Sequence, residues 1–104
     1  MTKVTLRPDA EDDLAAIYEF VADEAGAKIA HGYLLRIEAA ILALADFPHR
    51  GTSRPDIGHG VRITGFERRV TLLFQVLEGE VEILRVLYGG RDLKAILGGD
   101  PEGI

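Results

Sequence analysis

The N-terminal half of the chain changes from alternating polarity to a helical period. Residues 3–7 alternate between polar and apolar, which predicts a short, half-buried strand. Apolar residues then recur every three or four positions over residues 14–25, and a second stripe with this period runs from about 27 to 45. We expect Asp9 to cap the first helix and Gly26 to separate the two. Helices joined so closely form an antiparallel hairpin.

The C-terminal half has a period of two. Residues 49–60 have the Gly, Pro and polar composition of a loop. The stretches 61–65, 68–77 and 80–88 read as strands, and residues 78–79 suit a tight turn between the last two. Those last two stretches are apolar on both faces, which predicts that they lie in the middle of the sheet.

The predicted order is β-α-α-β-β-β, followed by one or two helical turns within residues 91–97. Because helices and strands are segregated along the chain, this order predicts an α+β fold, in which a helical hairpin packs on a small, mainly antiparallel sheet. A length of 104 residues suits one domain. We assign residues 1–97 to that domain and residues 98–104 to a loose C-terminal tail.

Composition acts mainly by exclusion. The chain has no cysteine, so disulfides, zinc-thiolate sites and thiol catalysis are ruled out. No apolar run approaches the ~18–20 residues that span a bilayer, and no secretory signal opens the chain, so we expect a cytoplasmic protein without a membrane partner. Phosphate-binding and zinc-protease motifs are absent, and the three histidines are scattered. We therefore expect no metal and no cofactor.

Net charge is unevenly distributed. Twelve basic and seventeen acidic residues give −5, which argues against a general or sequence-specific nucleic-acid binder. Residues 1–49 carry four basic and nine acidic residues. Residues 50–69 instead carry five arginines against two acids, or +3. A local basic patch is therefore expected on an acidic protein.

Two arginines stand inside strand patterns, where a charged side chain is unusual. These are Arg62 and Arg85. Alternation places Arg85 on the same face as Ile83, with Tyr88 on the opposite face. Four aromatic residues are expected in the core rather than as stacking platforms for bases: Tyr18, Phe20, Tyr33 and Phe74.

Arg85 has two readings. It either pairs with a carboxylate such as Glu67 or Glu82, or it binds a phosphate or carboxylate at an exposed sheet face, because a planar guanidinium makes bidentate contacts. The residues alone leave both readings open, and they point to no further chemistry.

Several motifs span nearly the full chain. It opens with Leu6-x-Pro8-x-Ala10-x-x-Asp13-Leu14-x-x-Ile17-x-x-Phe20, continues with Leu44-x-x-Phe47-Pro48-x-x-Gly51, and starts the next strand with Val61-Arg62. The most specific piece is the closing hairpin, Leu73-Phe74-x-Val76 and then Val81-Glu82-Ile83-Leu84-Arg85-Val86-Leu87-Tyr88-Gly89-x-Arg91-Asp92-Leu93. In this order and spacing the motifs resemble the ParE/RelE superfamily of type II toxin–antitoxin toxins, and more closely its ParE branch.

The resemblance implies a toxin that an antitoxin, encoded beside it, holds inactive. ParE-branch toxins are implied to poison DNA gyrase by binding. RelE-branch toxins instead cut mRNA in the ribosomal A site with a cluster of lysines, arginines and a C-terminal Tyr or His. Arg62, Arg85 and Tyr88 match positions of that cluster, but no lysine lies between Lys28 and Lys94. Two arginines and a tyrosine lack a convincing general base.

Three hypotheses stay open. The first, which we favour, is a gyrase-binding ParE-like toxin. The second is a ribosome-dependent mRNA endonuclease that uses Arg62, Arg85 and Tyr88. The third is a superfamily member that has another target, or that binds antitoxin without toxicity. The expected partners are a cognate ParD-like antitoxin and DNA gyrase. Candidate contacts for the target or the antitoxin are Arg50, Arg54, Arg62, Arg69, Arg85, Tyr88 and Arg91.

Overall fold

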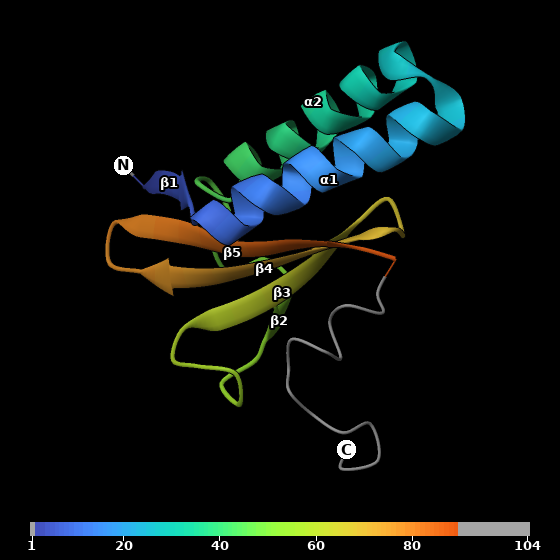
Figure 1. Cartoon of the computed structure of the whole chain (residues 1–104). Coiled ribbons are helices and arrows are strands. Elements are labelled where there is room, and N and C mark those ends of the chain that lie inside the picture. The colour runs from blue at the N-terminus through green and yellow to red at the C-terminus, as the bar shows by residue number, and fades with distance from the viewer. Residues whose placement is uncertain (1, 90–104) are drawn as a thin grey trace, which may run out of the picture.

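Two helices cover one face of a five-stranded sheet (Figure 1) in the computed structural model, which describes residues 2–89. The elements are β1 (Lys3–Leu6), α1 (Pro8–Ala25), α2 (Ala27–Ala43), β2 (Thr52–Ser53), β3 (Val61–Phe66), β4 (Val70–Leu77) and β5 (Glu80–Tyr88). The strand order is β1-β5-β4-β3-β2, with β1 parallel to β5 and every other pair antiparallel. The predicted α+β architecture and the inner positions of β4 and β5 are confirmed.

Some predictions fall outside the described residues. These are the helical turns over 91–97, the tail over 98–104 and the candidate contact Arg91. Within residues 2–89, no helix combines the length and hydropathy that a membrane crossing needs.

The helix boundaries follow proline and glycine. α1 begins at Pro8, which needs no amide partner at a first helical position, and the residue at the N-cap position is Arg7. The prediction of Asp9 as the cap is wrong; Asp9 lies in the first turn, where its charge still favours the helix dipole. Gly26 separates α1 from α2 with φ of 99°, as its conformational freedom allows.

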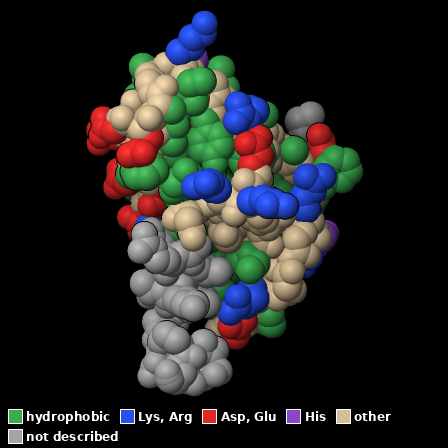
Figure 2. Space-filling model, turned by 90° about the vertical axis from the view of Figure 1, so that its right-hand side faces the viewer, with side chains coloured by type: hydrophobic (Ala, Val, Ile, Leu, Met, Phe, Trp, Pro, Cys, Tyr) green, Lys and Arg blue, Asp and Glu red, His purple; other side chains and the backbone are tan. Residues whose placement is uncertain are grey.

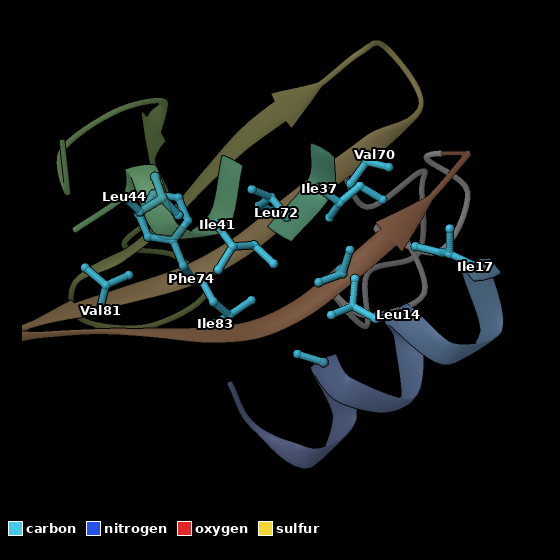
Figure 3. Close-up of a cluster of buried hydrophobic side chains, with 12 residues drawn as sticks. Leu14, Ile17, Ile37, Ile41, Leu44, Val70, Leu72, Phe74, Val81 and Ile83 are labelled. Atoms are coloured by element: carbon cyan, nitrogen blue, oxygen red, sulfur yellow. The ribbon is translucent and has the colours of Figure 1, made fainter. Parts of the chain in front are cut away.

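The core lies between the helical hairpin and the sheet (Figure 3). Its buried side chains come from both helices, from the residue that follows α2, and from β4 and β5; they include Leu14, Ile17, Ile37, Ile41, Leu44, Val70, Leu72, Phe74, Val81 and Ile83. Phe74 is fully buried, as predicted. Phe20 is 51% exposed, and its expected place in the core is wrong. It follows Ile17 by three residues and so lies about 60° to the side of the buried stripe.

A β-bulge changes the alternation in β5. Leu73 pairs with Arg85, whereas the next residue of β4 pairs with Ile83, so one residue of β5 is left over. Tyr88 therefore packs against the same helix-side core as Ile83, and Arg85 lies on the opposite face with Leu73. The prediction that Arg85 shares a face with Ile83, and that Tyr88 lies on the other face, is therefore wrong, because alternation takes no account of the extra residue.

The β3–β4 turn is longer than predicted. β4 begins at Val70 and not at residue 68, because Phe66 pairs with Val70 and residues 67–69 form the connection. Glu67 and Arg68 have positive φ values of 48° and 68°. Non-glycine residues adopt such values rarely, and the turn contains no glycine that would mark it in the sequence.

Candidate functional site

Arg62 holds the loop that precedes β3. Its guanidinium donates hydrogen bonds to the carbonyl oxygens of His49 (2.6 Å), Arg50 (3.2 Å) and Gly51 (3.1 Å). Three successive carbonyl groups thus converge on one cation, an arrangement that fixes the path of the loop. Arg62 therefore fixes the start of the loop that carries the candidate contacts Arg50 and Arg54.

Replacing Arg62 with alanine should lower the free energy of unfolding by about 1–3 kcal/mol, because three hydrogen bonds to a charged donor are lost at a partly exposed site. Amide exchange in residues 49–51 should become faster. Urea denaturation and hydrogen exchange measure both effects. Arg50→Ala is the control, because that side chain lies over the Phe47 ring (5.2 Å) and its loss should cost about 0.5–1 kcal/mol. Equal losses for the two variants would contradict this role of Arg62.

Asp13 joins α1 to β5. Its Oδ2 accepts hydrogen bonds from Arg85 Nε (2.7 Å) and from the backbone N–H of Val86 (2.8 Å), and its Oδ1 accepts one from Arg85 Nη2 (2.8 Å). The pairing of β1 with β5 ends at Ile83, so α1 takes over the edge of β5 from there. The side chains of Asp13 and Arg85 are 15% and 30% exposed. One carboxylate thus accepts hydrogen bonds from both the Arg85 guanidinium and a backbone N–H at the edge of β5.

Arg85 therefore pairs with a carboxylate, but not with either that the sequence suggested. Glu67 instead accepts two hydrogen bonds from Arg36, at 2.9 and 3.2 Å. Glu82 lies 3.8 Å from Arg7. The bulge places Arg85 at the strand edge that α1 covers, where the nearest acid comes from the first helix.

Arg62, Arg85 and Tyr88 do not form one cluster. Arg62 pairs with Phe74 and so shares its helix-side face, whereas Arg85 lies on the other face. Tyr88 pairs with Val70, four residues from Phe74 along β4, which corresponds to about 13 Å of strand. Both arginines already bind groups of this chain. The geometry therefore does not assemble the cluster that a nuclease of the RelE type would need.

The other candidate arginines differ in their contacts. Arg54 makes two hydrogen bonds to Asp56, at 2.7 and 2.9 Å, and this contact lowers the pKa of the Asp56 carboxyl. Arg69 has no hydrogen bond or ion pair from its side chain to any residue within 2–89. In the same range, no three side chains of His, Asp or Glu gather as a metal site would require.

Arg69 lines two adjoining hollows beside the helical hairpin. One measures about 450 Å³ and includes Phe20 and Tyr88; the other measures about 230 Å³ and includes Tyr33 and Tyr88. We call the surface formed by Phe20, Tyr33, Arg69 and Tyr88 the aromatic hollow. The ring centroids of Phe20 and Tyr88 are 5.5 Å apart, and those of Tyr33 and Tyr88 are 6.4 Å apart. Figure 2 shows hydrophobic side chains gathered on the side of the molecule that faces the viewer, with both basic and acidic side chains bordering them.

Tyr33, which lines the smaller hollow, has its hydroxyl group just beneath this surface. The oxygen is buried and has no hydrogen-bond partner within residues 2–89. Burial, more than any nearby charge, raises the pKa of the Tyr33 hydroxyl, so it stays protonated and is a donor. Arg36 lies 5.4 Å from the centroid of the same ring and lowers the pKa of the Glu67 carboxyl through their hydrogen bonds. Tyr33 and Arg36 were not among the predicted site residues, and no local sequence pattern marks them.

Comparisons with known proteins agree with this fold. A model of the ParE toxin of the type II toxin–antitoxin system parDE matches residues 4–93. Toxin ParE3 of Caulobacter vibrioides is 35% identical over 86 residues, which is 83% of this chain and 85% of that protein. A solved structure titled as the chromosomal ParDE TA system from P. aeruginosa is similar with a TM-score of 0.74 at 28% identity, over 85% of this chain and 96% of that one.

Proposed function

Because the chain belongs to the ParE toxin family of type II ParDE toxin–antitoxin systems, we propose that it arrests bacterial growth by binding DNA gyrase. We further propose that a ParD-like antitoxin, encoded beside it, neutralises it. The family match covers every described helix and strand except the first residue of β1. It is the observation that carries the toxin assignment.

The arginine contacts support binding over RNA cleavage. A nuclease of the RelE type needs cationic groups that converge on one phosphate. Here Arg62 is bound to backbone carbonyls and Arg85 to Asp13, on opposite faces of the sheet. A net charge of −5 also gives little attraction to naked RNA. These features favour an inhibitor that recognises a protein target.

An antitoxin partner is supported by the similar structure, which is titled as a ParDE system. This chain offers two kinds of receptor for such a partner. One is the edge of β3 beyond Ile63, since β2 pairs only with Arg62 and Ile63. The other is apolar surface on the helical hairpin, where Phe20, Leu35 and Leu42 are 51–64% exposed. Strand addition and helix docking use surfaces of these two kinds.

The test is pulse labelling of DNA, RNA and protein synthesis after controlled induction of the chain in bacteria. We expect DNA synthesis to fall first, growth to stop, and co-expression of the neighbouring antitoxin to restore it. The control is Phe74→Asp, whose fully buried charge should prevent folding. A first fall in protein synthesis would instead support the mRNA endonuclease. No fall with a soluble, folded chain would support the non-toxic family member.

A further inference from the structure

We propose that the aromatic hollow receives an adjacent apolar and acidic pair of side chains from the antitoxin. The apolar group would lie against Phe20 and Tyr88, and the carboxylate would accept hydrogen bonds from Arg69 and the Tyr33 hydroxyl. This inference rests on the proposed function, because it assigns a site to the antitoxin partner proposed there.

The aromatic hollow is bordered by exposed apolar side chains. Phe20 is 51% exposed although its ring contacts Tyr88, and Ile29, which lines the hollow beside Tyr33, is 57% exposed. Phe20 lines the larger hollow and Ile29 the smaller one, and the two hollows share Arg69 and Tyr88. Adjoining apolar surface of this kind is typical of a protein-binding site. Covering them would add hydrophobic stabilisation to a complex.

The hollow also contains two hydrogen-bond donors, Tyr33 and Arg69, whose side chains have no acceptor within residues 2–89. The Tyr33 oxygen is buried and has no partner within residues 2–89, and the Arg69 side chain has no hydrogen bond or ion pair there. Both residues line the same hollow. Glu67 and Asp13, the acids that line the two hollows, already accept hydrogen bonds from Arg36 and Arg85. Neither carboxylate is hydrogen-bonded to Arg69 or Tyr33, and an incoming carboxylate supplies two further acceptor oxygens.

The β3–β4 turn presents Arg69. Glu67 and Arg68, which precede it, hold positive φ values that non-glycine residues adopt at a cost of about 1–2 kcal/mol each. The Arg69 carbonyl also accepts a hydrogen bond from the Gly89 backbone (2.7 Å), so the turn is tied to the end of β5. Arg69 is thus held beside Tyr88, where its side chain can pair with an anion.

A peptide suits the hollow better than a nucleic acid. Tyr33 and Tyr88 pack edge to face, at 83° between their rings, and Phe20 also packs on Tyr88. These rings therefore pack against one another, whereas stacking of a base needs an exposed ring face. Apolar side chains line both hollows and Arg69 borders both, while the acids Asp13 and Glu67 are held by Arg85 and Arg36. This lining fits an apolar residue next to an Asp or Glu.

The experiment measures the affinity of the full chain for the antitoxin encoded beside it, by isothermal titration calorimetry. Arg69→Glu should weaken binding by about 30-fold or more, since a charge pair becomes a repulsion. Arg68→Glu makes the same charge change one residue away and outside the hollow, and it should stay within about threefold. Tyr33→Phe should weaken binding by about tenfold, yet leave the melting temperature unchanged or higher, because it removes an unpaired hydroxyl.

The outcomes separate the two proposals. If the wild-type chain does not bind the antitoxin, the proposed partner fails and this inference fails with it. If the wild type binds and both Arg69→Glu and Tyr33→Phe bind within threefold of it, the inference alone is overturned. It is overturned equally if Arg69→Glu abolishes growth arrest while antitoxin affinity is kept, because the hollow then faces the cellular target.

Discussion

Asp13→Ala should lower the free energy of unfolding by about 2–4 kcal/mol. The substitution removes three hydrogen bonds, leaving the Arg85 guanidinium without this carboxylate and the Val86 N–H without its acceptor. Breaking a fully buried ion pair costs about 3–5 kcal/mol. The Arg85 side chain is 30% exposed, so solvent recovers part of that cost. Urea denaturation monitored by circular dichroism measures the loss.

Asp12→Ala is the matched control for this prediction. It removes the neighbouring carboxylate from the same helix, but Asp12 is exposed and has no side-chain hydrogen bond within residues 2–89. Its effect should stay within about 0.5 kcal/mol. The losses of stability caused by Asp13→Ala and Arg85→Ala should also be strongly non-additive, because either substitution removes the hydrogen bonds that join the two side chains. Additive losses would show that the two side chains act independently.

This contact also bears on function. Arg85 lies in the motif on which the family resemblance is most specific, so its place in the motif suggests a site residue. In the structure its Nε and Nη2 donate to Asp13, and its strand is held to α1 by the same carboxylate. Arg85 is therefore a residue that positions β5 against the helical hairpin. All seven candidate contacts remain predictions for the binding surface: Arg50, Arg54, Arg62, Arg69, Arg85, Tyr88 and Arg91.

Local pattern was enough for the architecture. The helical hairpin follows from two stripes with a helical period on either side of Gly26, and β4 and β5 follow from runs that are apolar on both faces. These features depend on residues within one turn or one strand of each other. The order of the elements then leaves few ways to bury the apolar faces, and the observed one is the α+β arrangement.

Register and long-range contacts were not predictable in this way. The bulge opposite Leu73 changes the face of Tyr88, yet no residue in β5 signals an insertion. The partner of Arg85 comes from a helix 72 residues earlier in the chain. The aromatic hollow likewise combines Phe20, Tyr33 and Tyr88 from three elements. Each depends on how separate elements pack, which periodicity within one element does not encode.

Gly51→Ala should destabilise the fold strongly, by about 3 kcal/mol or more. Gly51 has φ of 82°, and a Cβ there would collide with the carbonyl oxygen of Ile63 and lie 2.8 Å from the Thr64 Cβ. The collision can be relieved only if the backbone at Ile63 moves. Ile63 pairs with Thr52, and this is one of the two residue pairs that join β2 to β3. The substitution should therefore release β2 as well as strain the backbone.

Gly79→Ala separates the two causes. Gly79 has a similar φ of 74°, but nothing lies within 4 Å of the position that a Cβ would take. Its substitution should cost only the backbone strain of about 1–2 kcal/mol. Urea denaturation of both variants, with hydrogen exchange at Thr52 and Ser53, makes the comparison. Equal destabilisation would mean that conformation alone requires glycine at residue 51. A larger loss for Gly51→Ala, with faster exchange in β2, would show that this glycine lets the loop approach β3 closely enough for Arg62 to bind its carbonyls.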